Sequence, residues 1–363
     1  MEVALLALTL ILAAANGAND VSKGIATVVG ARIASARNAV VWGVVCTAAG
    51  GLLAAFVTQG LVKTFSGKGL VLVPETGLPF FLAIAVGAIG WLVVATFTGT
   101  PVSTTHSLFG ALLGVAIVKG GLEGVAWAGA MTKVAAPLLF SPLVSLLLVL
   151  SVLPTVARVF RRFNRYCLCI EEQETAGASF GTGMAAASMI EERPRVVAGG
   201  SCSNESVARL SAVDSLHWLS SGATSFFRGM NDTPKILAIG IAASLAIGLS
   251  TMSMYMFVTV AMAIGGLFGG FRVVETLAHK VTPLEPDNGF AANLVTSILV
   301  GLASHWSMPV STTHVSSGAI FGTGLGSPKR GLRWKVVGEI LLAWVITLPV
   351  SGLLGGVAYA VLG

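Results

Sequence analysis

The sequence predicts an all-α polytopic membrane protein built from an inverted internal repeat, whose broken or re-entrant helices meet at a central site. The first observation is composition: 55% of the 363 residues are hydrophobic, only 10% are charged, and mean hydropathy is +0.86. Soluble domains carry about 25% charged residues, so this chain cannot cover a water-soluble globule. Ordinary cytosolic enzymes, disordered chains and disulfide-stapled secreted domains are therefore excluded.

The second observation is a series of apolar runs, five before and five after a polar stretch. A bilayer core of about 30 Å needs about 20 apolar residues, and only helices satisfy their own backbone in lipid. The runs are 3–30, 38–60, 78–98, 101–118 and 124–157, then 216–247, 250–270, 289–305, 309–325 and 335–362. We predict a first membrane repeat (1–157), a polar linker (158–212) that could include a short helix, and a second repeat (213–363). Whether segments 101–118 and 309–325 cross the membrane or fold back stays open.

The third observation is that motifs recur at nearly constant spacing. The segment Gly17–Lys23 resembles Gly229–Lys235, which lies 212 residues later, and Pro101–His106 is identical to Pro309–His314, which lies 208 residues later. Trp127 and Pro142 also recur, 207 residues later. Spacings this uniform indicate an internal duplication.

Basic residues predict the orientation of the two halves. They cluster at Arg32 and Arg37, at the start of the linker, and at Arg333 and Lys335. Lys and Arg are enriched in the cytoplasmic loops of membrane proteins. We therefore attribute the net charge of +6 to residues that set the orientation of the chain in the membrane, and we expect no nucleic-acid partner. Placing these clusters in the cytoplasm requires opposite orientations for the halves, a cytoplasmic linker and both termini outside. Inverted repeats are common in secondary transporters, with the substrate site at the repeat interface.

The duplicated Asn-Asp pairs are the first candidate site residues. A carboxylate at membrane depth is costly unless it is paired, so Asp20 and Asp232 are functional candidates. Together with Asn19 and Asn231 they offer the hard oxygen ligands that suit sodium, and they also favour helix breaks that free carbonyl groups. The structural alternative is a pair of salt bridges, to Lys23 and Lys235 respectively. The two interpretations can coexist.

The duplicated Pro-Val-Ser-Thr-Thr-His segments are the second candidate. Proline ends the preceding structure and a hydroxyl then caps a new helix, whose free N–H groups and dipole attract anions. The hydroxyls that could surround one tetrahedral anion are those of Ser103, Thr104, Thr105, Ser311, Thr312 and Thr313. Helix capping alone is the structural alternative. His106 and His314 could bond the anion, carry a proton, or only orient the hydroxyls.

Catalysis and channel activity are the competing functions. Ser103 and His106 have the residue types of a nucleophile and base, but no separate orienting acid is evident and the motif is duplicated. No ATP-binding phosphate loop occurs in the sequence, so the chain is expected to be neither an enzyme nor ATP-driven. Carboxylates that lie beside hydrogen-bond donors for an anion favour coupled binding of a cation and an anion over a simple pore. In coupled binding, each ligand raises the affinity of the site for the other.

With these four motifs in this order, the sequence resembles the PiT family of inorganic phosphate transporters. The resemblance covers both halves and excludes the linker. The first motif of the family often continues as Asp-Val-Ala-Asn-Ala, whereas this chain has Ser22-Lys23-Gly24 after Val21.

The resemblance implies symport of inorganic phosphate with sodium or protons across the inner or plasma membrane, by alternating access. Mapped here, the six hydroxyls would bind phosphate, and the two Asn-Asp pairs would bind sodium or complete the phosphate shell, supported by Lys23, Lys235, His106 and His314. Sodium is preferred because the ligands are all oxygens, and the proton is the alternative. Sulfate is the nearest competing anion, which Asp20 or Asp232 would exclude by accepting a proton from phosphate. No cofactor is expected beyond co-transported sodium, and a homodimer in the lipid bilayer is compatible with the sequence.

Overall fold

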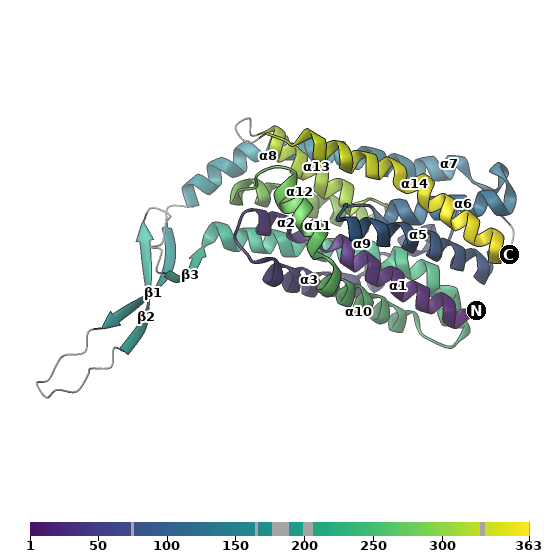
Figure 1. The fold of residues 1–363 in the computed structure, drawn as a ribbon, viewed down its shortest axis with the longest axis horizontal. Helices are drawn as coiled ribbons and strands as arrows, with labels where there is room; N and C mark the ends of the chain where they lie inside the picture. The colour runs from purple at the N-terminus through teal and green to yellow at the C-terminus, as the bar shows by residue number, and fades with distance from the viewer. Residues whose placement is uncertain (74–75, 164–165, 176–188, 199–205, 327–330, 363) are drawn as a thin grey trace, which may run out of the picture.

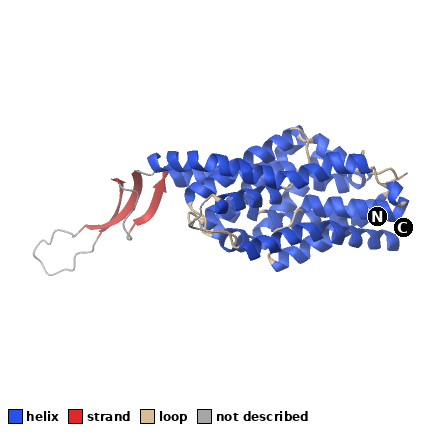
Figure 2. Cartoon of the chain, turned by 90° about the horizontal axis from the view of Figure 1, so that it is seen from above, coloured by secondary structure: helices blue, strands red, loops and turns tan. Residues whose placement is uncertain are grey.

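The computed structural model describes residues 1–73, 76–163, 166–175, 189–198, 206–326 and 331–362. Helices lie along one long axis and form a bundle, and a small sheet projects from one end (Figures 1 and 2). Both chain termini lie at the opposite end. The membrane part is therefore all-helical, as predicted.

The two halves contain the same series of helices. The first half comprises α1 (Glu2–Asp20), α2 (Ser22–Gly30), α3 (Ala36–Val57), α4 (Gln59–Phe65), α5 (Leu78–Thr98), α6 (Thr104–Gly120), η1 (Leu122–Gly124), α7 (Trp127–Gly129), η2 (Ala130–Ala135) and α8 (Ala136–Phe163). The second half comprises α9 (Ala212–Ala246), α10 (Thr251–Gly269), α11 (Phe271–Glu275), η3 (Thr276–Lys280), α12 (Pro286–His305), α13 (Thr312–Leu325) and α14 (Trp334–Leu362).

Helix packing confirms the inverted repeat. Helix α1 packs on α10 while its counterpart α9 packs on α3, and α14 packs on α6 while α8 packs on α13. Each contact between the halves thus has a reciprocal partner. Helix α1 runs toward the sheet end and α9 away from it, and α8 and α14 are likewise opposed (Figure 1).

The segments that contain the Pro-Val-Ser-Thr-Thr-His motifs are re-entrant. Helices α5 and α6 form a hairpin, as do α12 and α13, and each hairpin turns inside the bundle. Helix α6 has 17 residues and α13 has 14. At 1.5 Å per residue they reach roughly 25 Å and 21 Å, short of the roughly 30 Å core of a bilayer. We call residues 99–103 and 306–311 the two hairpin tips.

The helix breaks predicted at the Asn-Asp motifs are largely wrong. Val21 separates α1 from α2 but keeps helical angles, and its N–H still donates to the Gly17 carbonyl at 3.1 Å. In the second half the motif lies inside α9, which runs unbroken for 35 residues through Pro234. Neighbouring helices tolerate proline at membrane depth by satisfying the freed backbone groups. The free carbonyls near the Asn-Asp pairs come from the hairpin tips instead.

Glycines allow the halves to approach closely. A Cβ atom added to Gly50 of α3 would lie 1.8 Å from the Phe226 carbonyl oxygen of α9, and one added to Gly265 of α10 would lie 1.8 Å from the Ala14 carbonyl oxygen of α1. Such distances leave room only for hydrogen, which explains the need for small residues at these crossings. The two crossings are equivalent under the repeat, so both halves are held by the same kind of contact.

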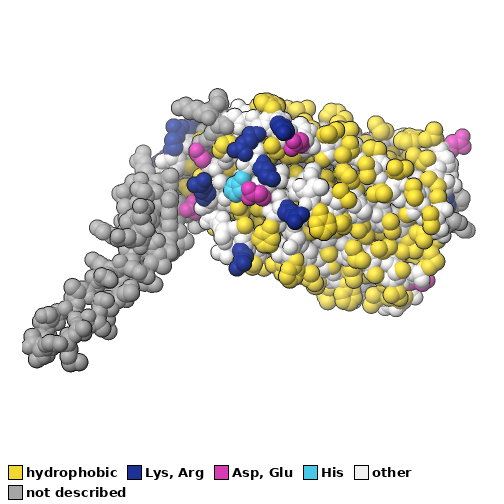
Figure 3. Space-filling view, viewed as in Figure 1, with side chains coloured by type: hydrophobic (Ala, Val, Ile, Leu, Met, Phe, Trp, Pro, Cys, Tyr) yellow, Lys and Arg dark blue, Asp and Glu magenta, His cyan; other side chains and the backbone are white. Residues whose placement is uncertain are grey.

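The surface supports membrane insertion. Within the described residues, six helical stretches are long and apolar enough to span a bilayer, and α9 is not among them although it has 35 residues. Buried charges within α9 lower its hydropathy. Hydrophobic side chains cover most of the face drawn in Figure 3, and Lys and Arg gather at the end that bears the sheet. Among the described basic residues, Arg32 and Arg37 lie around the connection from α2 to α3, and Arg158, Arg161 and Arg162 lie in the last turns of α8, next to the linker.

The linker contains a sheet, so the short helix considered for it is wrong within the described residues. Strand β1 (Tyr166–Thr175) lies between β2 (Met189–Ala198) and β3 (Ser206–Ser211), and both neighbours are antiparallel to it. Cys-Leu-Cys-Ile in β1 and Val-Val in β2 favour strands over a solvated helix. Residues 164–165, 176–188 and 199–205 of the linker lie outside the described residues.

Candidate functional site

Both Asn-Asp pairs and both hairpin tips come together in the centre of the bundle. Every side chain that the sequence singled out there is buried, and Asp20 and Asp232 are 1% and 2% exposed. The residues brought together are Asn19, Asp20, Lys23, Ser103, Thr104, Thr105, His106, Asn231, Asp232, Lys235, Ser311, Thr312, Thr313 and His314. The site is thus closed to solvent and contributed equally by the two halves.

Lys23 is enclosed by oxygen atoms. Its Nζ atom donates to the Asp20 carboxylate, to the Asn19 side-chain oxygen at 2.8 Å and to the Asn19 backbone oxygen at 3.2 Å. A fourth bond, of 3.3 Å, reaches the Val102 carbonyl of the first tip. One residue therefore ties the first Asn-Asp pair to the first hairpin.

Lys235 repeats this arrangement in the second half. Its Nζ atom donates to the Asn231 side-chain oxygen, to Asp232 Oδ1 at 3.2 Å and to the Val310 carbonyl of the second tip at 2.8 Å. It also donates to Thr105 Oγ1 at 2.8 Å. The salt-bridge alternative is therefore confirmed for both aspartates, inside the protein rather than at its surface.

The asparagine side chains also hold the hairpins. Asn19 Nδ2 donates to Thr96 Oγ1 and to the Thr100 carbonyl, both at 3.2 Å. Asn231 Nδ2 donates to Ser304 Oγ at 2.9 Å. The amide of each motif thereby fixes the end of α5 or α12, just before the tip.

The hydroxyl groups divide into caps and cross-links. Ser103 Oγ accepts from the His106 N–H at 3.2 Å and Ser311 Oγ from the His314 N–H at 3.1 Å, so both serines cap their helices as the structural alternative expected. The threonines link the tips instead. Thr105 donates to the Val310 carbonyl at 3.2 Å, and Thr313 donates to the Val102 carbonyl at 2.8 Å.

Two further residues complete the site, and sequence reasoning missed both. Asn16 Nδ2 donates to Asp20 at 3.0 Å, to Asp232 at 3.4 Å and to Thr104 Oγ1 at 2.9 Å. Arg228, 1% exposed, donates to Thr47 Oγ1 at 2.7 Å and to Asn16 Oδ1 at 3.4 Å. Residues 16 and 228 are equivalent under the 212-residue spacing, so the repeat could have identified them as a pair.

The two histidines stack on each other behind the tips. Their ring centroids are 4.2 Å apart, and His314 also stacks on Trp344 at 3.8 Å. His314 Nδ1 lies 3.3 Å from the Leu138 carbonyl, whereas His106 Nδ1 is buried and has no hydrogen-bond partner among the described residues. Both rings line a pocket of about 510 Å³ whose other lining residues are apolar. They therefore face away from the carboxylates, which favours a structural role in this conformation.

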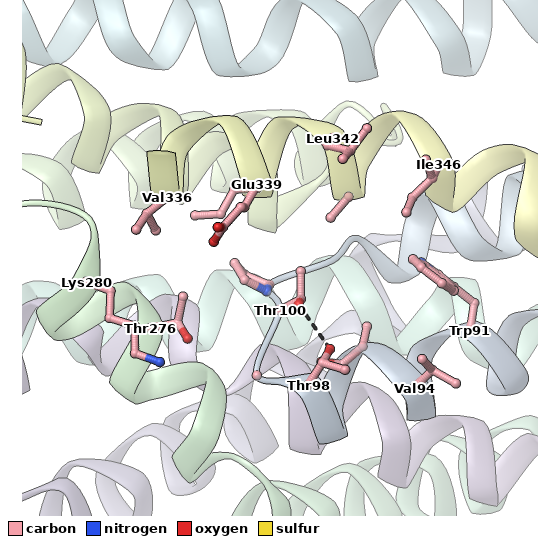
Figure 4. Close-up of a pocket in the computed structure, with 15 residues that line it drawn as sticks. Trp91, Val94, Thr98, Thr100, Thr276, Lys280, Val336, Glu339, Leu342 and Ile346 are labelled. Carbon is pink, nitrogen blue, oxygen red and sulfur yellow. Dashed lines mark hydrogen bonds between the residues drawn. The ribbon is translucent and has the colours of Figure 1, made fainter. Parts of the chain in front are cut away.

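A second pocket reaches the first hairpin tip from the side. Figure 4 shows it between the end of α5, η3 and the start of α14, with a volume of about 360 Å³. Thr98 and Thr100, whose hydroxyls are 3.0 Å apart, line this pocket together with Glu339 and Lys280.

The charges of the buried site do not cancel. In their ordinary charge states, Lys23, Lys235 and Arg228 contribute three positive charges and Asp20 and Asp232 two negative ones. The net charge of this cluster is therefore +1. A buried cluster of this kind can bind one small anion, because an added negative charge neutralises it.

Comparisons with known proteins agree with this chemistry. The sequence pattern described as "Phosphate transporter family" matches residues 16–355. A protein of Rhizobium meliloti described as "Probable low-affinity inorganic phosphate transporter" is 30% identical over 366 residues, covering 98% of this chain and 95% of that protein. A Bacillus subtilis protein with the same description is 26% identical over 355 residues, covering 96% and 92%.

One solved structure has the same fold. It is described as "The sodium-dependent phosphate transporter" and superposes with a TM-score of 0.77 over 99% of this chain and 98% of that chain. The sequence identity is 21%, so the likeness concerns the fold.

Proposed function

The chain belongs to the phosphate transporter family, and on this premise we propose that it carries inorganic phosphate across the membrane with a cation by alternating access. The observation that carries the proposal is the closed, positively charged cluster between two inverted hairpins. An inverted repeat allows one site to open toward either side, because the two halves can exchange conformations.

We assign phosphate to the space beside the hairpin tips. The threonine hydroxyls at the start of α6 and α13 already form hydrogen bonds across the two tips, and the same donors can turn to phosphate oxygens. Arg228 and Asn16 add donors that neither hairpin supplies. The six hydroxyls from Ser103 to Thr105 and from Ser311 to Thr313 remain the proposed phosphate shell, the serines acting through the helix starts that they cap.

Two cations are candidates for the coupling ion. The sequence favours sodium. A solved structure with the same fold is described as a sodium-dependent phosphate transporter, which supports this choice. The proton is the alternative, and the positions of Lys23 and Lys235 favour it because ammonium groups already contact the Asn-Asp oxygens.

The proposed orientation follows from surface charge. Basic side chains concentrate at the end that bears the sheet, which by the positive-inside rule is cytoplasmic (Figure 3). The linker would then be inside a cell membrane and both termini outside. Labelling of intact cells with an impermeant thiol reagent tests this orientation, using chains with one cysteine each, either introduced at residue 2 or the native Cys167 of β1, and with the other native cysteines replaced by serine.

The decisive experiment is uptake of labelled phosphate by proteoliposomes that contain the purified protein. An inward sodium gradient, an inward proton gradient and neither gradient are compared, with sulfate as a competitor. Accumulation driven by either gradient supports symport and identifies the cation. No uptake under any gradient, by protein shown to be folded, would overturn the assignment.

A further inference from the structure

Two ammonium groups of the chain itself occupy the positions at which a coupling metal ion would be held. We propose that Lys23 and Lys235 are resident cations that fill two oxygen cages, so that sodium neither binds at the Asn-Asp pairs nor is required there for phosphate binding. This inference adds detail to the proposed function. It rests on the proposed function only in taking phosphate as the bound anion.

The donor set around each lysine is of the kind that binds sodium. Lys23 Nζ contacts one carboxylate, one amide oxygen and two backbone carbonyls, those of Asn19 and Val102. Hard cations in proteins take this mixture of carboxylate and neutral oxygens. These oxygen atoms are therefore suitable ligands for sodium, but the ammonium nitrogen of Lys23 lies at the centre between them.

The second cage is built by the other half together with Thr105 of the first half. Lys235 Nζ contacts one carboxylate, one amide oxygen, one hydroxyl and the Val310 carbonyl. In both halves the lysine follows its aspartate by three residues and reaches the valine of its own tip. The duplication shows that the placement is a feature of the motif rather than of one local conformation.

Charge and burial exclude an additional metal ion. Both lysines are 1% exposed, and the cluster that they form with Arg228 and the two aspartates already carries +1. A sodium ion in each cage would raise this to +3 without any ligand of opposite charge in the described site. Desolvation makes such an excess of buried charge strongly unfavourable. Each lysine thus takes the place of a sodium ion.

Shortening the lysine should create a sodium site. Lys23→Ala empties the cage and leaves Asp20 without its partner, so a sodium ion can enter. Lys23→Met is the matched control because it removes the same charge but keeps the space filled. The pair Lys235→Ala and Lys235→Met repeats the test in the second half, and Lys335→Ala, at an exposed position, controls for charge removal.

The measurement is thermal unfolding of the purified protein in potassium phosphate, with sodium chloride compared with N-methyl-D-glucamine chloride at equal ionic strength. We expect no sodium-specific shift for wild type, Lys23→Met or Lys335→Ala. For Lys23→Ala we expect Tm to rise by about 5 °C at sodium concentrations near 100 times Kd. Phosphate uptake by the wild type is expected to be the same with and without sodium.

A saturable sodium-specific Tm shift in the wild type, or wild-type uptake that requires sodium, overturns the inference. Lys23→Ala and Lys235→Ala that fold but gain no sodium response also overturn it. If these variants do not fold, the wild-type titration still decides. Absence of phosphate uptake counts against the proposed function alone, because sodium-dependent unfolding requires no transport.

Discussion

Replacing Arg228 by methionine tests whether the buried positive charge binds the anion. Methionine keeps an unbranched side chain but removes the guanidinium and its bonds to Thr47 and Asn16. The cluster charge then falls from +1 to zero. We expect weaker phosphate binding and a less stable protein, each from a separate cause.

The magnitudes follow from the geometry. The 2.7 Å bond to Thr47 is charge-assisted and contributes about 1.5–3 kcal/mol, whereas the 3.4 Å bond to Asn16 contributes less. Loss of one partner from a buried ionic cluster costs about 3–5 kcal/mol of stability. For phosphate, losing one charge-assisted hydrogen bond from the Arg228 guanidinium costs about 2 kcal/mol. Kd should therefore rise by about 30-fold.

The assay is equilibrium binding of labelled phosphate to purified protein, with Tm measured on the same samples. Arg228→Lys keeps the charge and should lose less than tenfold in affinity. Arg161→Met removes an exposed arginine of α8 and should leave Kd unchanged. A folded Arg228→Met protein that binds phosphate with the wild-type Kd would refute the role of this charge.

Three further outcomes are expected. Thr105→Val and Thr313→Val each remove one bond between the hairpin tips, at about 1 kcal/mol each, and should lower phosphate uptake at least tenfold. Tm should change little for Thr313→Val and fall further for Thr105→Val, which also removes the bond from Lys235. Gly50→Ala places a Cβ atom 1.8 Å from a backbone oxygen of α9 and should lower stability by more than 3 kcal/mol in denaturant unfolding. Asp20→Asn should reduce the preference for phosphate over sulfate in competition assays, because it removes an acceptor for the phosphate proton.

Each of these outcomes has a control. Thr132→Val removes an exposed hydroxyl of η2 that bonds only within its helix and should leave uptake unchanged. Gly338→Ala adds a Cβ atom with nothing within 4 Å and should not destabilise the protein. Unchanged uptake in both tip variants, unchanged stability of Gly50→Ala, or unchanged anion preference in Asp20→Asn would contradict the corresponding argument.

The fold was predictable because its signals are local and occur twice. Apolar runs predicted the helices, and the constant spacing of the motifs predicted the inverted repeat that the packing of α1 on α10 and of α9 on α3 confirms. The hairpins were left open because apolar composition does not distinguish a crossing helix from a re-entrant one. The structure answers this question, since the two hairpin tips meet in the centre through the bonds of Thr105 and Thr313.

The residues of the site could be predicted from the sequence, but most of the hydrogen bonds between them could not. Asp20 and Lys23 lie three residues apart, so their ion pair is visible in the sequence. The bonds from Thr105 to Val310 and from Thr313 to Val102 join residues more than 200 positions apart, and no local pattern encodes them. Arg228 was overlooked because it precedes the duplicated motif and its counterpart in the first half is Asn16 rather than a second arginine, although α9 carries it into the centre.

The same bonds explain how a closed site can open toward either side. The valine of each tip is held by the lysine of its own half and by a threonine of the other half, and the first tip is also bonded to Asn19, so releasing one tip breaks at least two bonds. At about 1–3 kcal/mol each, this cost is comparable to the free energy that a bound anion gains in a site of net charge +1. The two tips are not held identically, because Asn19 bonds to Thr100 in the first tip whereas Asn231 bonds to Ser304 at the end of α12. Asn16 and Arg228, at equivalent positions of the repeat, add a second difference between the halves. We therefore expect these unequal bonds, rather than the shared valine contacts, to set the relative stability of the two open states.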